Sequence, residues 1–486
     1  QTTEYFAEQT TSDILSDIKN NNNVLQSKEN NNSNQPTVKN REHLDIVKQL
    51  NQSVPCLVDS LIPGESPRLS FYKEGYCNES LQLYYYVSSP RSHSGTEKNM
   101  AKAGGFQQTN NTALADLYLC YSCFSNRKKF PKAHLHSTVP GYGSFTNKRS
   151  FANTVQKYER KKQLKNSIIP KSFLLPEQFP ALQRFNKTYH GYYILKPATG
   201  GRGNGIKLIK YQSEIPKGRW IIQQYLESVL IDGHKFDLRL YLLITNVEPF
   251  IAYVYADGLT RFAQTKYKAP DMNNQKLKNM HLTNVAINEG IVLNSSVILG
   301  QWSLNTTFNH LEQHPELFNP GVKVTVKSLY KEFKRVTRRA LAASHEILVN
   351  ATAKRGLRRY PVEYFSLHAL DIVILKDGSM KIFEINVAPQ YSLRTQFDFD
   401  LKATLMRSAF DLVGFRAYRQ KFDPNVKGYE GLFGNLTTKE KRILIQVADE
   451  ETRLRNWVPL DIWEDLDTDA NKLVKDNIKM VRGTDL

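Results

Sequence analysis

Two carboxylates and one side-chain amide, those of Asp371, Glu384 and Asn386, have the types and spacing of a metal site. They lie in Leu370–Pro389, LDIVILKDGSMKIFEINVAP, where two apolar runs flank Asp377–Gly378, a pair that favours a two-residue hairpin turn. Counting outward from this turn places Asp371 opposite Glu384, with Asn386 on the same face. Carboxylates this close repel each other unless one is protonated or a cation lies between them. Their oxygens suit Mg²⁺ that carries nucleotide phosphates, although an ordinary hairpin with solvent-facing acids also fits.

A glycine-rich segment between two predicted strands could close over phosphates. Pro197–Gly205, PATGGRGNG, follows the predicted strand Tyr192–Lys196 and precedes a second one at Ile206–Ile209. No GK[ST] sequence and no helix follow the glycines, so the segment is neither a P-loop nor a dinucleotide-binding fingerprint. The backbone N–H groups of such a flap could bind phosphate, and Lys196 could add a cation. A mobile hairpin is the plainer interpretation.

The strands that follow carry polar side chains on one face. Lys235–Thr245, KFDLRLYLLIT, alternates Lys235, Asp237 and Arg239 with apolar residues, which is typical of a strand that lines a polar cleft or faces solvent. Trp220–Leu226 is predicted as a strand with a pair of glutamines. These positions could therefore border the same cleft as the metal-type hairpin.

The remaining elements are predicted from their periodicity. Ile251–Phe262 is interpreted as a hairpin with Arg261 after its turn, and His281–Asn288 as a segment that closes the cleft. Ser328–Asn350 is amphipathic at helical spacing. Its polar side carries Lys331, Lys334, Arg335, Arg338 and Arg339. Such a face is either solvated or a surface for an acidic partner.

The size and charge of the chain restrict its class and partners. With 486 residues and 40% hydrophobic residues, it can form two or three domains, and its net charge of +19 indicates an anionic partner. Nucleic acid is disfavoured because aromatic residues do not alternate with the basic ones. The sequence has no run of about twenty apolar residues, so no membrane span is predicted. Clustered cysteines at Cys56, Cys77, Cys120 and Cys123, together with sequons such as Asn78, leave a secretory location open.

Composition and pattern suggest five regions. Residues 1–42 are predicted to be a disordered Asn-rich arm, 43–190 an N-terminal α/β region, 191–250 a central domain, 251–430 a C-terminal domain with the hairpin, and 431–486 a charged tail. The elements expected in these regions also include a strand at Leu114–Phe124, a turn at Val139–Lys148, helices at Ser150–Gln163 and Leu401–Phe415, and an extended segment at Ile169–Pro176.

Five segments resemble, in order, motifs of the tubulin tyrosine ligase-like family: KPATGGRGNGI, QQYLESVLIDGHKFDLRLYLLIT, ADGLTRFAQTKY, HLTNVAIN and LDIVILKDGSMKIFEINVAP. The resemblance covers residues 110–415 and implies an ATP-grasp fold of the α/β (α+β) class, in which an N-terminal, a central and a C-terminal domain enclose a nucleotide cleft. It also implies ATP-dependent addition of an amino acid to glutamate side chains or termini of tubulin tails, through an acylphosphate. The glutamylating members are the more similar ones, so free glutamate is the expected amino acid.

The resemblance also implies roles for particular residues. Arg239 and Arg261 would face the phosphates and the acceptor carboxylate, and Asp371, Glu384 and Asn386 would be the Mg²⁺ ligands. Residues of the same motifs would hold ATP: Lys148, Lys196, Arg202, Gln223, Gln224, Tyr225, Leu226, Lys235, Asp237, Thr283 and Asn284.

Two departures from the family pattern leave the substrate open. Val387–Gln390 replaces the usual small residue followed by Pro-Ser, and His368–Ala369 stands where a glycine-bearing turn with an aromatic residue is usual. One alternative is a ligase that glycylates or glutamylates a non-tubulin acidic protein, with the secretory lumen as a possible compartment. The other is a microtubule- or acidic-protein-binding module that has lost catalysis. The expected location is the cytoplasm, at microtubules, and the complete phosphate and metal set argues for an active enzyme.

Overall fold

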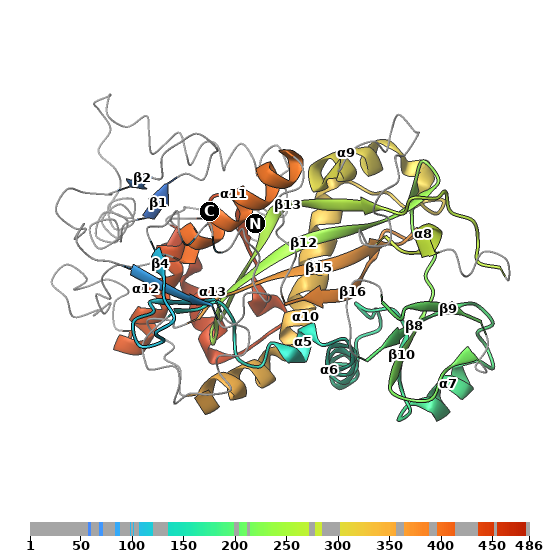
Figure 1. The fold of residues 1–486 in the computed structure, drawn as a ribbon, viewed down its shortest axis with the longest axis horizontal. Helices are drawn as coiled ribbons and strands as arrows, with labels where there is room; N and C mark the ends of the chain where they lie inside the picture. Colours follow the sequence, from blue (N-terminus) through green and yellow to red (C-terminus); the bar gives the residue numbers. More distant parts are fainter. Residues whose placement is uncertain are drawn as a thin grey trace.

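The computed structural model describes residues 57–59, 68–70, 83–87, 98, 101, 106–119, 135–198, 204–210, 214–271, 278–283, 302–355, 364–387, 396–413, 436–451 and 454–482. Within these ranges the chain forms four β-sheets, and helices pack on both faces of the largest (Figure 1). In the same ranges, no helix is long and apolar enough to cross a bilayer. The predicted arm and all four cysteines lie outside the described residues.

The largest sheet has seven antiparallel strands in the order β14-β13-β12-β15-β16, with β11 paired to β12 and β17 paired to β13. Successive side chains of β12, the long central strand, point to opposite faces of the sheet and enter two hydrophobic cores. Leu240 and Leu242 belong to one core, and Tyr241 and Leu243 belong to the other. The strands are β11 (Leu230–Ile231), β12 (His234–Val247), β13 (Phe250–Phe262), β14 (Trp302–Ser303), β15 (Ser366–Ile374), β16 (Met380–Asn386) and β17 (Trp457–Pro459).

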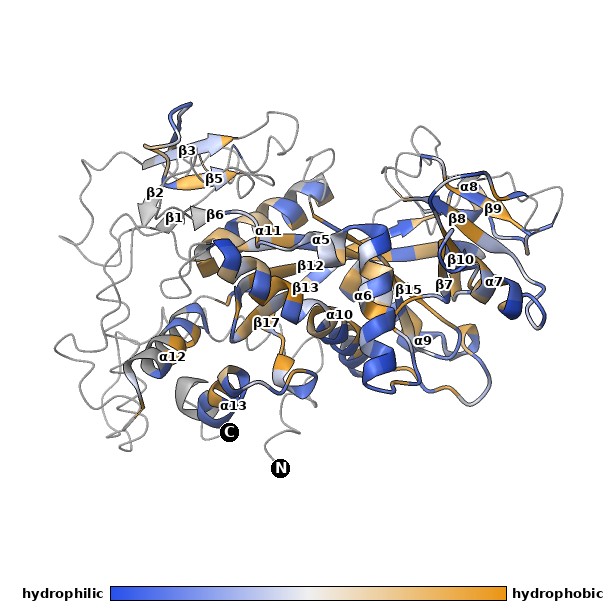
Figure 2. Cartoon of the chain, turned by 90° about the horizontal axis from the view of Figure 1, so that it is seen from below, coloured by the Kyte–Doolittle hydropathy of each residue, from blue (hydrophilic) through white to orange (hydrophobic). Residues whose placement is uncertain are grey.

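Helices bury both faces of this sheet, whose strands are predominantly hydrophobic in Figure 2. The first face packs against α5 (Gly143–Thr146), α6 (Lys148–Lys161), α9 (Leu304–Gln313) and α10 (Val326–Arg355). The second packs against α11 (Gln396–Val413), α12 (Thr438–Glu451) and α13 (Asp469–Arg482). In α10, Leu329, Phe333 and Ala340 recur at helical spacing and are buried, which explains why the helix forms. It extends beyond the predicted Ser328–Asn350 at both ends.

A smaller antiparallel sheet of four strands, in the order β7-β10-β8-β9, stands beside the large one (Figure 1). It has its own core, which includes Phe173, Leu195 and Ile222. Strand β7, from the predicted N-terminal region, pairs with β10 of the predicted central domain. The elements are β7 (Ser172–Leu175), α7 (Phe179–Phe185), β8 (Tyr193–Pro197), β9 (Lys207–Ile209) and β10 (Trp220–Gln224). Helix α8 (Lys278–His281) follows β13 in the chain and contacts β12 of the large sheet.

The other two sheets are short. A parallel sheet has the order β4-β3-β5-β6, and β1 pairs with β2. Of the strand predicted at Leu114–Phe124, only Leu117–Leu119 is observed as a strand, and residues 120–124 lie outside the described residues. These strands are β1 (Leu57–Asp59), β2 (Arg68–Ser70), β3 (Leu83–Val87), β4 (Phe106–Gln108), β5 (Leu117–Leu119) and β6 (Leu135–His136).

The prediction of a hairpin at Ile251–Phe262 was wrong, because this segment belongs to the single strand β13. The Asp257–Gly258 pair that suggested a turn instead lies at an irregularity in the pairing with β12. A Cβ added to Gly258 would come within 2.6 Å of Leu240 Cδ2 and 2.7 Å of the Arg239 carbonyl oxygen. Glycine is therefore required here by the close approach of the neighbouring strand rather than by a turn.

The hairpin of β15 and β16 is observed, with Asp371 opposite Glu384 as predicted. The predicted two-residue turn was wrong, because Leu375 pairs with Ser379 and the loop has three residues that end in Gly378 at φ +80°. This loop shifts the register by one residue. A β-bulge at Phe383 shifts it back, so that Asp371 and Glu384 still face each other.

Candidate active site

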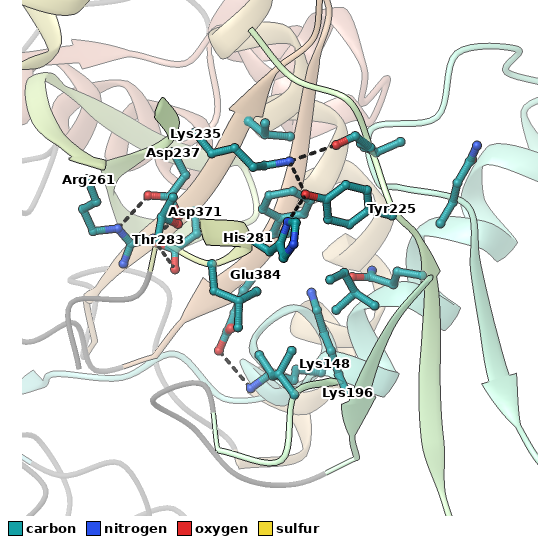
Figure 3. Close-up of a pocket in the computed structure, with 18 of the residues that line it drawn as sticks. Lys148, Lys196, Tyr225, Lys235, Asp237, Arg261, His281, Thr283, Asp371 and Glu384 are labelled. Carbon is teal, nitrogen blue, oxygen red and sulfur yellow. Dashed lines mark hydrogen bonds and ion pairs between the residues drawn. The ribbon is translucent and has the colours of Figure 1, made fainter. Parts of the chain in front are cut away.

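A pocket with about 950 Å³ of open space lies where the small sheet meets the large one. Its walls come from β8 and β10 of the small sheet, from β12, β13, β15 and β16 of the large sheet, and from the start of α6. Figure 3 shows charged side chains from these elements pointing toward one another. The predicted site residues that line it are Lys148, Lys196, Gln223, Gln224, Tyr225, Leu226, Lys235, Asp237, Arg261, Thr283, Asp371 and Glu384.

The other predicted site residues lie beside the pocket or outside the described part of the chain. Arg239 and Asn386 both contact Asp371, with a distance of 3.3 Å between Asn386 Nδ2 and Asp371 Oδ2. Arg202 and Asn284 are not among the described residues. The predicted site residues that the structure describes therefore lie in or beside one pocket. Their individual roles stay predictions.

Two arginines, buried Arg261 and half-buried Arg239, hold the carboxylate of Asp371. Arg239 donates from Nε and Nη2 to its two oxygens at 3.0 and 2.9 Å, and Arg261 Nη2 lies 3.0 Å from Oδ2. Arg261 also holds Asp237 through Nε at 2.7 Å and through Nη2. Burial disfavours the charged form of Asp371, but both guanidiniums outweigh it and lower the pKa of this carboxyl to about 2.

The opposite carboxylate, Glu384, has a different partner. Lys148, the first residue of α6, donates from Nζ to Glu384 Oε1 at 3.0 Å. The helix begins here because the Asn147 side chain accepts from the Arg149 and Ser150 N–H groups. This cap fixes the start of α6, and with it Lys148, at the edge of the pocket.

Lys196 is a buried cation at the end of β8 that lines the pocket. Its ammonium group lies 5.3 Å from the centre of the Phe383 ring, and no described carboxylate is within ion-pair distance. Burial lowers the pKa of Lys196 to about 8, with Glu384 opposing this effect and Lys148 adding to it. An anion in the pocket would remove the cost of burying this charge.

The far end of the pocket is largely apolar and contains one polar network. Lys235 Nζ donates to the Tyr225 hydroxyl and the Leu226 carbonyl, each at 3.1 Å, and Tyr225 Oη lies 3.0 Å from His281 Nδ1 (Figure 3). Burial lowers the pKa of Lys235 to about 7, and burial raises the pKa of the Tyr225 phenol. A charged Lys235 has three N–H donors, so these bonds leave one for a ligand.

Some lining residues were not predicted as site residues. His281 belongs to the HLTNVAIN motif, and this motif was the only signal that could have identified it. Phe383 reaches the pocket next to Glu384 because the bulge interrupts strand alternation, which no sequence signal marks. The apolar wall is formed by Ile194, Ile206, Phe236, Leu282 and Val373.

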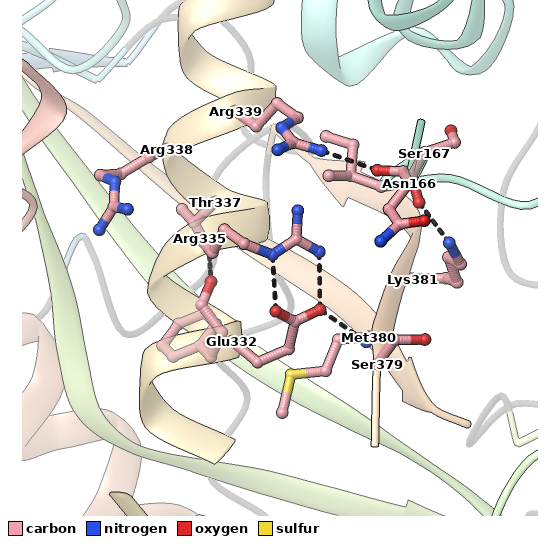
Figure 4. A network of polar contacts seen from close by, with 12 residues as sticks. Asn166, Ser167, Glu332, Arg335, Thr337, Arg338, Arg339, Ser379, Met380 and Lys381 are labelled. Carbon is pink, nitrogen blue, oxygen red and sulfur yellow. Dashed lines mark hydrogen bonds and ion pairs between the residues drawn. The ribbon is translucent and has the colours of Figure 1, made fainter. Parts of the chain in front are cut away.

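The predicted basic face of α10 is largely engaged inside the molecule (Figure 4). Arg335 makes two hydrogen bonds to Glu332, Arg338 donates to Asp465 at 3.0 Å, and Arg339 donates to the Asn166 carbonyl at 2.7 Å. The expectation that these arginines attract an acidic partner is therefore not supported by their contacts. They bind the helix to the chain around it.

Comparison with known proteins gives the same family as the motifs. A family model for the tubulin-tyrosine ligase family matches residues 127–421. Tubulin monoglutamylase TTLL4 of Homo sapiens is 31% identical over 258 residues, which are 51% of this chain and 21% of that protein. Tubulin polyglutamylase TTLL13 of Homo sapiens is 30% identical over 303 residues, which are 60% of this chain and 35% of that protein. Tubulin polyglutamylase TTLL7 of Homo sapiens is 27% identical over 302 residues, which are 57% of this chain and 32% of that protein.

These matches span only 21% to 35% of the lengths of the three relatives. The family match, in contrast, covers more than half of this chain and includes every residue that lines the pocket. The observed mixture of helices and antiparallel sheets confirms the expected α+β, ATP-grasp-like class. The chain therefore belongs to the tubulin-tyrosine ligase family.

Proposed function

We propose that this chain is an ATP-dependent ligase that adds glutamate to glutamate side chains of tubulin tails. The observation that carries the proposal is the setting of Lys196, a buried cation without a described carboxylate partner, next to the opposed Asp371 and Glu384. A polyphosphate would supply the missing negative charge. The relatives are a tubulin monoglutamylase and a tubulin polyglutamylase, which supports glutamate as the amino acid and tubulin as the acceptor.

The two ends of the pocket suit the two ends of ATP. Lys148 and Lys196 lie at the charged end, where they would bind phosphate oxygens. At the other end, the apolar wall would cover the adenine ring, and the free N–H of Lys235 would bind a ring nitrogen. Gln223 Nε2 donates to Ser172 Oγ at 3.0 Å, and this bond joins β10, which would border the adenine ring, to β7.

The residues at the charged end also suit Mg²⁺. Asp371, Glu384 and Asn386 would offer side-chain oxygens from neighbouring strands, and these are the hard ligands that Mg²⁺ prefers. When bound, the ion would neutralise phosphate charge during phosphoryl transfer. The described residues contain no group of three or more His, Cys, Asp or Glu side chains that could hold a metal ion, and the proposed ligands here are two carboxylates and one amide.

The chemistry must activate a carboxylate, because a carboxylate and an amine do not condense in water. The γ-phosphoryl group of ATP would pass to the acceptor glutamate, giving an acylphosphate and ADP. The amino group of free glutamate would then attack the acyl carbon and release phosphate, forming the amide bond. Arg239 and Arg261, held rigidly by Asp371 and Asp237, would stabilise the negative charge that develops on oxygen.

The test offers labelled glutamate, glycine and tyrosine separately, with ATP, to microtubules. We expect ATP-dependent incorporation of glutamate into tubulin tails and little label from the other two. Microtubules whose tails have been removed by proteolysis are the control and should take up no label. Incorporation of glycine or tyrosine alone, or incorporation without ATP, would contradict the proposal. The corresponding location is the cytoplasm, at microtubules.

A further inference from the structure

Helix α6 has two faces with different roles. Phe151, Ala152 and Val155 are buried against the large sheet, together with Glu159. At 100° per residue, Lys157, Arg160 and Lys161 lie on the opposite side of the helix. Each of these three residues is exposed, as are Lys162 and Lys165 just beyond the helix end. We call these five residues the α6 basic patch.

No acidic side chain from the surrounding segment of the chain neutralises the α6 basic patch. Between Lys148 and Leu175 the sequence contains a single acid, Glu159. Its side chain is buried, and Oε1 accepts a hydrogen bond from the Ile168 N–H at 2.8 Å. Among the described residues, no carboxylate lies within ion-pair distance of any patch residue. The patch therefore differs from the α10 arginines, whose charges are used inside the fold.

The patch is connected to the pocket by the helix itself. Lys148, at the first turn of α6, lines the pocket and holds Glu384, whereas the patch begins near the last turn. In Figure 2, α6 carries mostly hydrophilic residues. Gln156 also anchors the helix, since Nε2 donates to the Ser172 carbonyl at 2.7 Å. The position of the patch relative to the pocket is therefore fixed.

We propose that the α6 basic patch binds acidic residues of the acceptor segment while its modified glutamate lies in the pocket. The inference rests on the proposed function, because that function supplies an acidic peptide as the acceptor. A helix of 14 residues separates the two places by about 20 Å. The patch lies on the other side of α6 from Lys148, so the peptide must also pass round the helix. An extended peptide covers about 3.4 Å per residue, so acidic residues about six or more positions from the acceptor reach the patch.

The test compares two variants with the same change of charge. In the patch variant, Arg160, Lys161, Lys162 and Lys165 are all replaced by Gln, which keeps good helix propensity. In the control variant, Lys323, Lys331, Lys354 and Lys475 are replaced by Gln. These lysines are also exposed but lie elsewhere: Lys323 just before α10, Lys331 and Lys354 in α10, and Lys475 in α13. Both variants should fold, since no described ion pair is lost.

The probe is a fluorescent peptide of about fourteen residues, with one central glutamate and further glutamates about six positions away on both sides. Its binding is measured by fluorescence anisotropy at low ionic strength. We expect the patch variant to bind this peptide about tenfold more weakly than the parent and the control variant to lose at most about twofold. A second peptide of about five residues around the same glutamate is too short to reach the patch and should bind all three proteins equally.

Two results would overturn the inference. One is equal binding of the long peptide by the patch variant and the parent, and the other is an equal loss in the patch and control variants. ATP-dependent incorporation of labelled glutamate into tubulin tails by the parent tests the proposed function separately. If the tails receive no label but long-peptide binding still depends on the patch, the proposed function fails and the patch remains a binding surface for acidic peptides.

Discussion

Asp371 and Glu384 occupy directly opposed positions on β15 and β16, and each carboxylate is paired with different cations. Arg239 and Arg261 hold Asp371, whereas Lys148 holds Glu384 at 3.0 Å. The repulsion expected for two facing acids is therefore relieved without a bound ion. Because the Lys148 pair is partly exposed, Glu384 is the easier of the two acids to turn toward a metal.

Replacing Glu384 with Gln should separate ligand binding from folding. The amide oxygen can still accept from Lys148, so the stability without nucleotide should change by less than about 1 kcal/mol. The increase in Tm caused by Mg²⁺ and ATP should shrink, because the variant binds them more weakly. Ligation should fall at least about 100-fold, since metal stabilisation of phosphoryl transfer is worth several kcal/mol. Thermal melts with and without Mg²⁺-ATP provide the measurement.

Glu177→Gln is the matched control for this experiment. Glu177 also pairs with basic residues, Arg149 and Arg219, but it does not line the pocket. The control should retain the full nucleotide-dependent rise in Tm and full activity. A Glu384→Gln protein that behaved like the control would refute the assignment of Glu384 as a metal ligand.

Gly258→Ala should destabilise the protein by about 1–3 kcal/mol, because the new methyl group would overpack β12. It would clash with Leu240 Cδ2 and with the carbonyl oxygen of Arg239, both closer than 3 Å. Gly143→Ala is the control, since a Cβ there meets nothing within 4 Å and the residue lies in α5. Chemical denaturation of both variants gives the comparison, and equal stabilities would show that β12 can yield at this position.

The sequence predicted the carboxylate pair from apolar alternation on both sides of Asp377–Gly378, although the same pattern around Asp257–Gly258 lies inside the single strand β13. It could not predict the three-residue loop or the compensating bulge at Phe383, since both depend on packing against other parts of the chain. The charges of Arg335 and Arg338 were visible in the sequence, but their partners were not. Arg338 pairs with Asp465, more than a hundred residues away, so only the fold distinguishes a structural arginine from a docking one.

His281 is predicted to position Lys235 through Tyr225. A charged Lys235 can only donate, so the Tyr225 oxygen accepts from it, and the Tyr225 hydroxyl donates to His281 Nδ1 when His281 carries its proton on Nε2. His281→Leu removes that acceptor and should raise the KM for ATP about tenfold with little change in kcat. His281→Asn places an amide oxygen near the same point and should restore most of the loss. Equal KM values for both variants would show that the hydrogen bond from Tyr225 to His281 does not control the binding of ATP.

Arg261→Met should destabilise the fold by about 3–5 kcal/mol, because it leaves buried Asp237 without its cation. Arg239 would still neutralise Asp371. Adding Asp237→Asn should therefore recover a large part of the stability by removing the unpaired charge. Urea denaturation of the single and double variants measures the recovery. A double variant less stable than Arg261→Met would show that Asp237 has another partner that matters more.

The affinity for ATP should fall as the pH rises through about 8, because this is the pKa to which burial lowers Lys196. Above this pH, Lys196 loses its proton in the folded protein, and a neutral amine attracts phosphate far less than an ammonium. The folded pKa lies below the unfolded value of 10.5, so the stability of the protein without nucleotide should rise between about pH 8 and 10.5 while the affinity for ATP falls.

Lys196→Arg distinguishes this explanation from a general effect of pH. A guanidinium remains charged over the whole range, so the variant should retain its affinity for ATP above pH 8, even if the different shape of arginine weakens binding at every pH. Titrations with Mg²⁺-ATP between pH 7 and 9.5 measure both curves. The nearby groups that also affect this charge are Glu384, Lys148 and Asp371, and both proteins contain them unchanged. Parallel losses of affinity in parent and variant would mean that Lys196 is not the group whose charge holds the phosphates.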